Sequence, residues 1–285
     1  MLTPTINFED KLLDQHVRRA LEDKPIGHFS LTGIDDLIGG IHRGRFTIIA
    51  GQPGVSKSTL IGQLADDAAA LGFISVVNTL ELAPHQFICK SIMRMSATPS
   101  DDGAMPSLDN PRVTSAIETY RRTIAPNLCF VDAPCTAIDL GAEVARIQQD
   151  RGQQVILFQD YLQIMPSGIE PCLDERLAIK SSVAALRNIA NAHDIPVIAI
   201  SSINRTSYGG GKTGLECLGG CNAIEYSADT VLLLAIDGDK SERETNLQLV
   251  RRPLVITALK NRYAPLGSAG LELNTSISSF TSRRP

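Results

Sequence analysis

The chain has 285 residues, 43% of them apolar, and its 27 Lys plus Arg against 31 Asp plus Glu give a net charge of −4. Such an apolar fraction supports a sizeable core and excludes disorder of the whole chain. The acidic balance argues against a wholly basic nucleic-acid coat but is compatible with a local basic loop. The apolar runs are far shorter than a membrane span. Glu9, Asp10 and Lys11 stand where a signal peptide needs an apolar core. We therefore expect a cytoplasmic protein that makes no membrane contact.

The six cysteines are scattered along the chain. Cys217 and Cys221 are four residues apart, but no second close pair of cysteines or histidines completes a zinc set. We expect buried thiols in a reducing compartment, where cysteines behave as small apolar residues.

The first predicted element is an amphipathic helix over residues 8–23. Its apolar stripe includes Leu12, Leu13, Val17 and Leu21 and needs a surface to cover it, either on its own domain or on a neighbouring subunit. We expect residues 1–26 to form a helical arm and residues 27–285 to form one large domain.

From Gly27 onward, short apolar runs alternate with helical patterns. Strands are predicted over residues 46–50, 74–78, 128–131, 155–158, 197–200, 230–236 and 255–259. Helices are predicted over residues 57–71, 84–95, 138–150 and 175–193, and a surface excursion over residues 96–113. Continuous apolar strands that alternate with helices predict an α/β fold with a mainly parallel, twisted sheet and helices on both faces.

The strongest chemical signal is GQPGVSKST at residues 51–59, directly after a predicted strand and directly before a predicted helix. A P-loop requires this context, because the backbone N–H groups of the loop and the start of the helix hold phosphate oxygens. Lys57 would reach the β and γ phosphates of ATP, and the Ser58 hydroxyl would bind Mg²⁺. The predicted nucleotide-binding residues are Gly51, Gln52, Pro53, Gly54, Val55, Ser56, Lys57, Ser58 and Thr59. Ser56 departs from the pattern, which has glycine before the lysine. The alternative is a glycine-rich turn without a ligand.

Two acidic residues follow predicted strands. Asp160 follows the strand over 155–158, which we expect to lie beside the P-loop strand, where a carboxylate can bind Mg²⁺ partly through water. Glu81 follows the strand over 74–78 by three residues and is placed to activate an attacking water. Either acid alone would indicate only a solvated charge at a strand end, so the prediction depends on their combination with Lys57.

These segments, from about Gly27 to Leu273, resemble the RecA-like motor domain of DnaB-type replicative helicases. TLELAPHQ is similar to the segment that carries the family's catalytic glutamate, and this similarity points to Glu81. LFQDYLQIM resembles the Walker B strand and points to Asp160. ALKNRYAPLG is similar to the segment that supplies a lysine and an arginine finger to the neighbouring active site, here Lys260 and Arg262.

The resemblance implies a RecA-like P-loop NTPase that forms a homo-oligomer, a hexameric ring, on single-stranded DNA. It also implies 5′ to 3′ movement and contacts with other replication proteins. The sequence departs from the family at Ser56 and at Ser202, where a glutamine that senses the γ-phosphate is usual. We also expect no N-terminal primase-binding domain, since residues 1–26 alone precede the predicted motor.

DNA contacts are expected on loops near residues 165–175 and 205–221. The second loop is rich in glycine, and backbone N–H groups with a few cations can follow the phosphates of a single strand. The DNA-binding residues predicted there are Arg205, Gly210, Gly211 and Lys212. By its composition alone, the segment would be an ordinary surface loop, whereas the resemblance favours DNA contact.

The sequence therefore predicts an ATP hydrolase that drives a DNA helicase, with ATP and Mg²⁺ as cofactors. The alternative is a RecA-like ATP-binding regulatory or helicase-loading protein without unwinding activity. The altered P-loop favours this alternative, and the retention of Glu81, Lys260 and Arg262 favours the motor.

Overall fold

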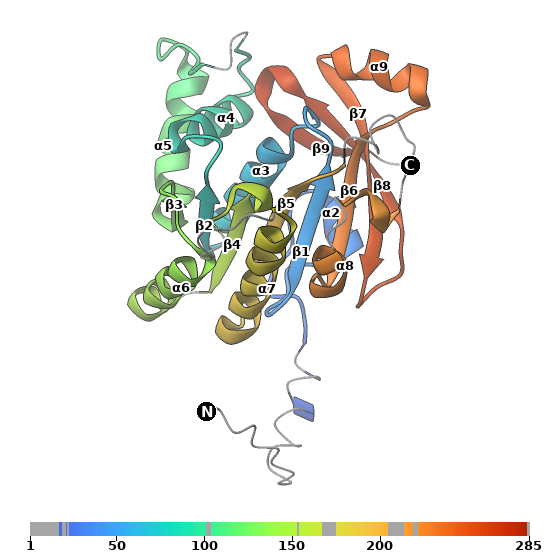
Figure 1. The fold of residues 1–285 in the computed structure, drawn as a ribbon. Helices are drawn as coiled ribbons and strands as arrows, with labels where there is room; N and C mark the ends of the chain where they lie inside the picture. The colour runs from blue at the N-terminus through green and yellow to red at the C-terminus, as the bar shows by residue number, and fades with distance from the viewer. Residues whose placement is uncertain are drawn as a thin grey trace.

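The computed structural model describes residues 17–18, 21, 23–100, 104–152, 154–166, 175–204, 214–218 and 222–283. Within these residues, nine strands form one sheet in the order β3-β2-β4-β5-β1-β6-β7-β8-β9 (Figure 1). The strands are β1 (Phe46–Gly51), β2 (Ile74–Thr79), β3 (Leu128–Val131), β4 (Val155–Asp160), β5 (Val197–Ser202), β6 (Thr230–Ile236), β7 (Arg251–Asn261), β8 (Ser268–Asn274) and β9 (Ser279–Arg283). The first six strands of this order, from β3 across to β6, are parallel to one another. Strands β7, β8 and β9 extend the sheet beyond β6, and each of them is antiparallel to its neighbours. The mainly parallel sheet expected from the sequence is confirmed.

The central strands β1, β2 and β4 are buried along their whole length, which explains their nearly continuous apolar sequences. Strand β5 lies between β4 and β1, and its Val197 is the register partner of both Leu157 and Phe46. The expectation that the strand before Asp160 lies beside the P-loop strand is therefore wrong. Because β5 is itself apolar and buried, it takes a place with a strand on each side.

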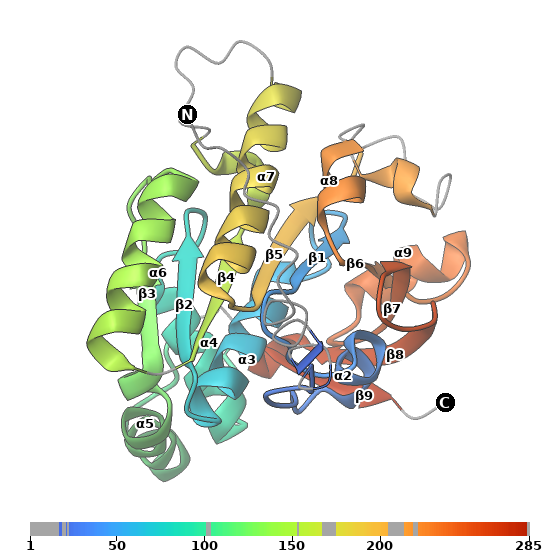
Figure 2. The same ribbon diagram turned by 90° about the horizontal axis from the view of Figure 1, so that it is seen from below.

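Helices cover both faces of the sheet (Figure 2). They are α2 (Thr32–Ile38), α3 (Lys57–Ala70), α4 (Pro84–Ser96), α5 (Pro111–Thr123), α6 (Ala137–Arg151), α7 (Glu175–His193), α8 (Asn222–Ser227) and α9 (Lys240–Gln248). Helices α2 to α5 lie on one face and α6 to α8 on the other. Neighbouring residues of β1 point to opposite cores: Ile49 packs with Leu60 of α3, whereas Ile48 packs in the core that contains Val183 of α7. The P-loop strand is thus fixed from both sides.

Helix α5 and the antiparallel strands differ from the sequence-based expectation. Helix α5 begins inside the expected excursion over 96–113, because the Asn110 side chain accepts a hydrogen bond from the backbone N–H of Arg112 and Pro111 occupies the first helical position. Strand β7 is longer than the predicted 255–259, and β8 and β9 were not predicted. Strands β7, β8 and β9 pair with one another and pack against α2 (Figure 2).

The predicted N-terminal helix over residues 8–23 lies largely outside the described residues. Two residues of its apolar stripe, Val17 and Leu21, are described, and both are exposed. The chain contacts the domain at Asp23, whose Oδ1 is 3.0 Å from Nδ1 of His42. Among the helices of the described residues, none has the length and apolar character needed to cross a membrane.

Candidate functional site

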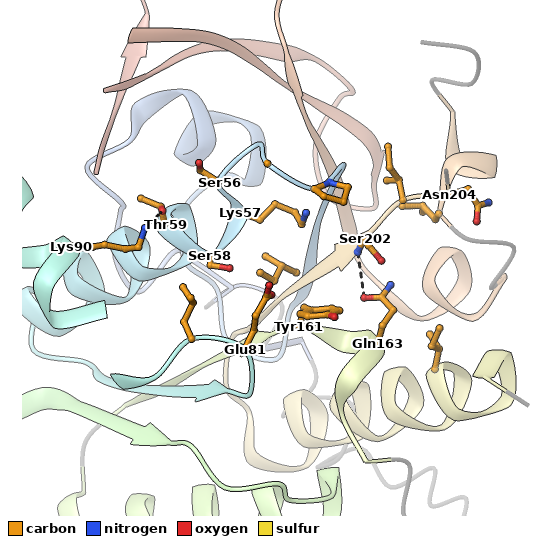
Figure 3. A pocket seen from close by; sticks show the side chains of 17 residues that line it. Ser56, Lys57, Ser58, Thr59, Glu81, Lys90, Tyr161, Gln163, Ser202 and Asn204 are labelled. Atoms are coloured by element: carbon orange, nitrogen blue, oxygen red, sulfur yellow. Dashed lines mark hydrogen bonds between the residues drawn. The ribbon is translucent and has the colours of Figure 1, made fainter. Parts of the chain in front are cut away.

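The predicted P-loop and Glu81 line a cavity of ≈ 790 Å³ at the carboxyl ends of the parallel strands (Figure 3). This is the edge of an open α/β sheet at which ligands generally bind. The labelled side chains come from the start of α3 (Ser56, Lys57, Ser58, Thr59), the end of β2 (Glu81), α4 (Lys90), the segment after β4 (Tyr161, Gln163), and the end of β5 and the residues after it (Ser202, Asn204).

The loop after β1 has the backbone form that phosphate binding needs. Ser56 is in the left-handed region, with φ 65° and ψ 39°, and Gly54 has φ 84°. Helix α3 begins immediately afterwards at Lys57, so its first N–H groups point toward the cavity, where they favour an anion. The Ser56 backbone thus adopts the conformation that glycine usually provides.

Lys57 folds along the loop. Its Nζ donates to the carbonyl oxygens of Gly51 at 2.8 Å and Gln52 at 3.0 Å. Burial lowers the pKa of the Lys57 ammonium below its ordinary value, and the charges of Asp160 and Glu81 act in the opposite direction. The ammonium therefore lies in a partly desolvated position, where its attraction to an anion is strong.

Asp160 is fully buried at the end of β4. Within the part of the chain that the structure describes, neither of its carboxylate oxygens meets the geometry of a hydrogen bond, although the Ser58 hydroxyl lies close enough to favour the charged carboxylate. Burial raises the pKa of Asp160 to about 6; the Ser58 hydroxyl and the Lys57 ammonium lower it, and Glu81 raises it further. A buried carboxylate whose oxygens lack well-formed hydrogen bonds is costly, and a cation at this point would satisfy both oxygens.

Glu81 lies close to Asp160 because their strands are in register. Thr79, the last residue of β2, is the register partner of Asp160, and Glu81 follows two residues later. Its side chain is exposed and lines the cavity. An exposed carboxylate at the cavity wall can accept a proton from a water molecule held there.

The cavity also contains polar residues that the sequence did not single out. Lys90 of α4 donates from Nζ to Oγ1 of Thr59 at 3.1 Å, and burial lowers its pKa. Tyr161 and Gln163 follow Asp160 at the exit of β4 and line the wall. The run of polar residues after Asp160 in LFQDYLQIM is the signal that could have indicated Gln163.

Lys260 and Arg262 lie away from this cavity; among the described residues that line it, neither is present. Lys260 Nζ donates to the carbonyl oxygens of Glu225 at 2.5 Å and Ala228 at 2.7 Å. Arg262 donates to Oδ1 of Asp229 at 3.0 Å. Both cations are therefore held at the end of α8 in their own subunit.

The predictions for DNA-binding residues and for cysteines can be compared with the structure only in part, because some of these residues lie outside the described ranges. Arg205, Gly210, Gly211 and Lys212 lie outside the described residues. In the part of the chain that is described, no group of three or more His, Cys, Asp or Glu side chains could hold a metal ion. Cys217 is buried, but Cys89, Cys129 and Cys135 are only half-buried, so the expectation of buried thiols is correct only in part.

This strand order, a phosphate loop after β1 and acids at the ends of β2 and β4 define a P-loop domain of the RecA-like class. A family model described as "DnaB-like helicase C terminal domain" matches residues 28–282. The chain belongs to this family.

Individual relatives agree with this assignment. "Replicative DNA helicase DnaB" of Treponema pallidum (strain Nichols) is 30% identical over 264 residues, which cover 90% of this chain and 56% of that protein. The solved "ATPase Domain of G40P" superposes with a TM-score of 0.81 at 19% identity, covering 98% of this chain and 100% of that one. A DnaB-like replicative helicase, solved for its interactions with primase, gives a TM-score of 0.79 at 19% identity and covers 97% and 68%. At such identities the structures show a common fold. The chain spans about half the length of the curated relatives it matches.

Proposed function

We propose that the chain is the ATP-hydrolysing motor of a replicative DNA helicase. One observation carries the proposal: Lys57, Ser58 and Glu81 line one cavity, and the buried carboxylate of Asp160 at the end of β4 lies close enough to interact with all three. A cation, a hydroxyl and two carboxylates around a phosphate loop are the parts that phosphoryl transfer needs.

ATP binds, in this proposal, with its phosphates against residues 51–59. The N–H groups of the loop and of the first turn of α3 hold the phosphate oxygens, and Lys57 exchanges its two carbonyl acceptors for the β and γ phosphates. A charged phosphate oxygen is a stronger acceptor than a backbone carbonyl, which favours the exchange.

Ser58 and Asp160 fit a Mg²⁺ ion, partly through water. The fit rests on the two buried oxygens of Asp160, neither of which makes a well-formed hydrogen bond among the described residues, and on the Ser58 hydroxyl beside them. Hard oxygen donors and phosphate oxygens are the ligands that Mg²⁺ prefers. When bound, the ion supplies neutralisation of the charge on the phosphates.

Glu81 takes the proton from the attacking water. Its position after β2 places it at the wall opposite the loop, and its exposure leaves the carboxylate open to solvent.

Lys260 and Arg262 act on the nucleotide of the neighbouring subunit in a hexameric ring. Their distance from the cavity of their own subunit supports a role in trans. The ring surrounds single-stranded DNA, with Arg205, Gly210, Gly211 and Lys212 following its phosphates, and moves 5′ to 3′. Other replication proteins are proposed as partners.

A strand-displacement assay on a forked DNA substrate tests the activity. The protein should separate the strands with ATP and Mg²⁺ and fail with a non-hydrolysable ATP analogue. Lys57→Ala is the negative control, since it removes the phosphate-binding cation.

Two results would contradict the proposal. Hydrolysis without unwinding on substrates of either polarity would favour a regulatory or helicase-loading protein. Unwinding by Lys57→Ala at the rate of the parent would place the active site elsewhere.

A further inference from the structure

A glutamine side chain joins the ends of two strands at the wall of the cavity. Gln163 lies in the short 3-10 turn Leu162–Ile164, three residues after Asp160. Its Oε1 accepts a hydrogen bond from the backbone N–H of Ser202 at 3.3 Å (Figure 3), and its Nε2 donates to Oγ of Ser201 at 2.9 Å. The amide of Gln163 thus connects the exit of β4 with the end of β5.

This connection begins where the backbone pairing of the two strands ends. The register between β4 and β5 stops at Gln159 and Ala199, although β5 continues to Ser202. Backbone donors in a buried sheet need partners, and the side chain of Gln163 provides one for Ser202. The side chain of Gln163 therefore supplies a hydrogen bond at a position where the backbone of β4 no longer pairs with β5.

The same end of β5 contacts the phosphate loop on its other side. Ser202 is the register partner of Gly51, the last residue of β1. The carbonyl oxygen of Gly51 accepts a hydrogen bond from Lys57 Nζ. A chain of contacts thus crosses the edge of the sheet: Lys57 bonds to Gly51, Gly51 is paired with Ser202, and Ser202 bonds to Gln163.

A carboxamide has two N–H donors and one acceptor oxygen. The bonds to Ser202 and Ser201 use the oxygen and one donor, and among the described residues the second N–H of Gln163 has no partner. The side chain lines the same cavity as Lys57 and Glu81. A donor at this wall is suited to a phosphate oxygen.

Ser202 has a short side chain at this end of β5. Its hydroxyl cannot extend as far as a glutamine amide, although it also lines the cavity. Gln163, which enters from the neighbouring strand, brings an amide to the same place.

We propose that Gln163 detects the third phosphate of the bound nucleotide by donating its second amide N–H to a γ-phosphate oxygen. This inference rests on the proposed function, because it requires ATP in the cavity. The bonds from Gln163 to Ser201 and Ser202 then carry the difference between ATP and ADP to the end of β5, from which the chain continues toward residues 205–221. A merely structural clamp would make no such distinction between the two nucleotides.

Binding of fluorescent ADP and of a fluorescent non-hydrolysable ATP analogue separates these roles. Gln163→Ala should weaken the ATP analogue by about 10-fold, equivalent to about 1.4 kcal/mol, and leave ADP affinity unchanged. Gln163→Glu keeps an acceptor for the N–H of Ser202 but places a carboxylate beside the phosphate, so it should weaken the ATP analogue further. Ile164→Ala is the matched control, since Ile164 lies in the same turn and is exposed.

A rescue variant tests the position of the amide. In the Gln163→Ala background, Ser202→Gln returns an amide to the end of β5 and should restore part of the preference for the ATP analogue. Equal weakening of both nucleotides by Gln163→Ala, with a lower melting temperature, would show a structural clamp and overturn the inference. Unchanged binding of both would also overturn it.

The same binding experiments distinguish a failure of the proposed function from a failure of the inference about Gln163. If the parent fails to bind either nucleotide at millimolar concentration, the proposed function is wrong and the inference is wrong with it. If the parent binds and Lys57→Ala does not, but Gln163→Ala keeps the parent's preference for the ATP analogue, only the inference is wrong.

Discussion

Arg262 is joined to the fully buried Asp229 through both its side chain and its backbone. Its Nη1 donates to Oδ1 at 3.0 Å, and its backbone N–H donates to the carbonyl oxygen of Asp229, also at 3.0 Å. The other carboxylate oxygen accepts from the backbone N–H of Phe46 at 2.9 Å and from Arg187. Because Phe46 begins β1, one buried carboxylate connects the strand of the proposed finger to the strand that leads to the P-loop.

The first prediction concerns the role of Arg262 in trans. Arg262→Ala should keep nucleotide binding and lose ATP turnover, since an arginine finger contributes ~10³ to 10⁵ fold. Asp229 keeps Arg187 and Phe46 as partners, so the variant should still fold. Mixing Arg262→Ala with Lys57→Ala subunits should restore turnover at sites that combine an intact loop with an intact finger.

Arg251→Ala is the control for this mixing experiment. Arg251 is an exposed arginine at the start of β7, the strand that Arg262 directly follows, and pairs with Glu272. It should keep full turnover. Absence of recovery at every mixing ratio, with co-assembly shown by co-purification of an untagged variant with a tagged one, would contradict a role in trans.

The second prediction separates binding from hydrolysis. Lys57→Ala should abolish ATP binding, because it removes the cation of the loop. Glu81→Gln should bind ATP normally and lose turnover by ~10² to 10⁴ fold, the usual contribution of a general base. Nucleotide titration and phosphate release measure the two steps. Parent-level hydrolysis by Glu81→Gln would show that another group takes the proton.

The P-loop and the acid at the end of β4 could be predicted because their signals are local. Residues 51–59 are consecutive, and Asp160 directly follows an apolar run. The position of β5 between β1 and β4 could not be predicted in this way, since strand order depends on contacts between distant segments. Asp160 still lies beside Ser58 and Lys57 of the P-loop even though its strand is not adjacent to β1.

The contributions of Lys90 and Gln163 were missed for a related reason. Lys90 contacts Thr59 only because α4 packs on α3, and Gln163 is defined by the end of the register between β4 and β5. Strand β8 was missed because its pattern is weak. In Ser268–Asn274 the alternating apolar residues are Ala269, Leu271 and Leu273, and only the two leucines are large, which leaves a short and weak pattern.

The third prediction concerns a buried acid outside the cavity. Asp66 of α3 pairs with Arg94 of α4, and burial raises the pKa of Asp66 to about 6 from its ordinary value of 3.8. Between pH 3.8 and about pH 6, Asp66 is therefore protonated in the native state and ionised in the unfolded chain. The resulting stabilisation is fully present below the unfolded pKa and is lost as the pH rises through about 6.

Asp66→Asn removes this titration. The free energy of unfolding of the parent relative to Asp66→Asn should fall by on the order of 3 kcal/mol between acidic and neutral pH, from ~1.4 kcal/mol for each pKa unit. Urea denaturation of both proteins across this range measures the difference, with Asp36→Asn as an exposed control. A difference that rises with pH would reverse the assigned direction of the pKa of Asp66.

The last prediction concerns the left-handed backbone of Ser56. A non-glycine residue in such a conformation is strained by ~1 to 3 kcal/mol, and Ser56 has φ 65°. Ser56→Gly releases this strain and lets the loop close more tightly on the phosphates; the greater freedom of glycine in the unfolded chain lowers the free energy of unfolding by ~0.4 to 1 kcal/mol but does not affect binding. We expect Ser56→Gly to tighten ATP binding by about one order of magnitude or less.

Ser56→Ala keeps the strain and removes the hydroxyl, so it should bind like the parent in a titration with a fluorescent ATP analogue. If both variants bind more weakly, the Ser56 hydroxyl is a phosphate ligand. If only Ser56→Gly binds at millimolar nucleotide, the parent is a degenerate ATPase, and a regulatory role becomes the better explanation.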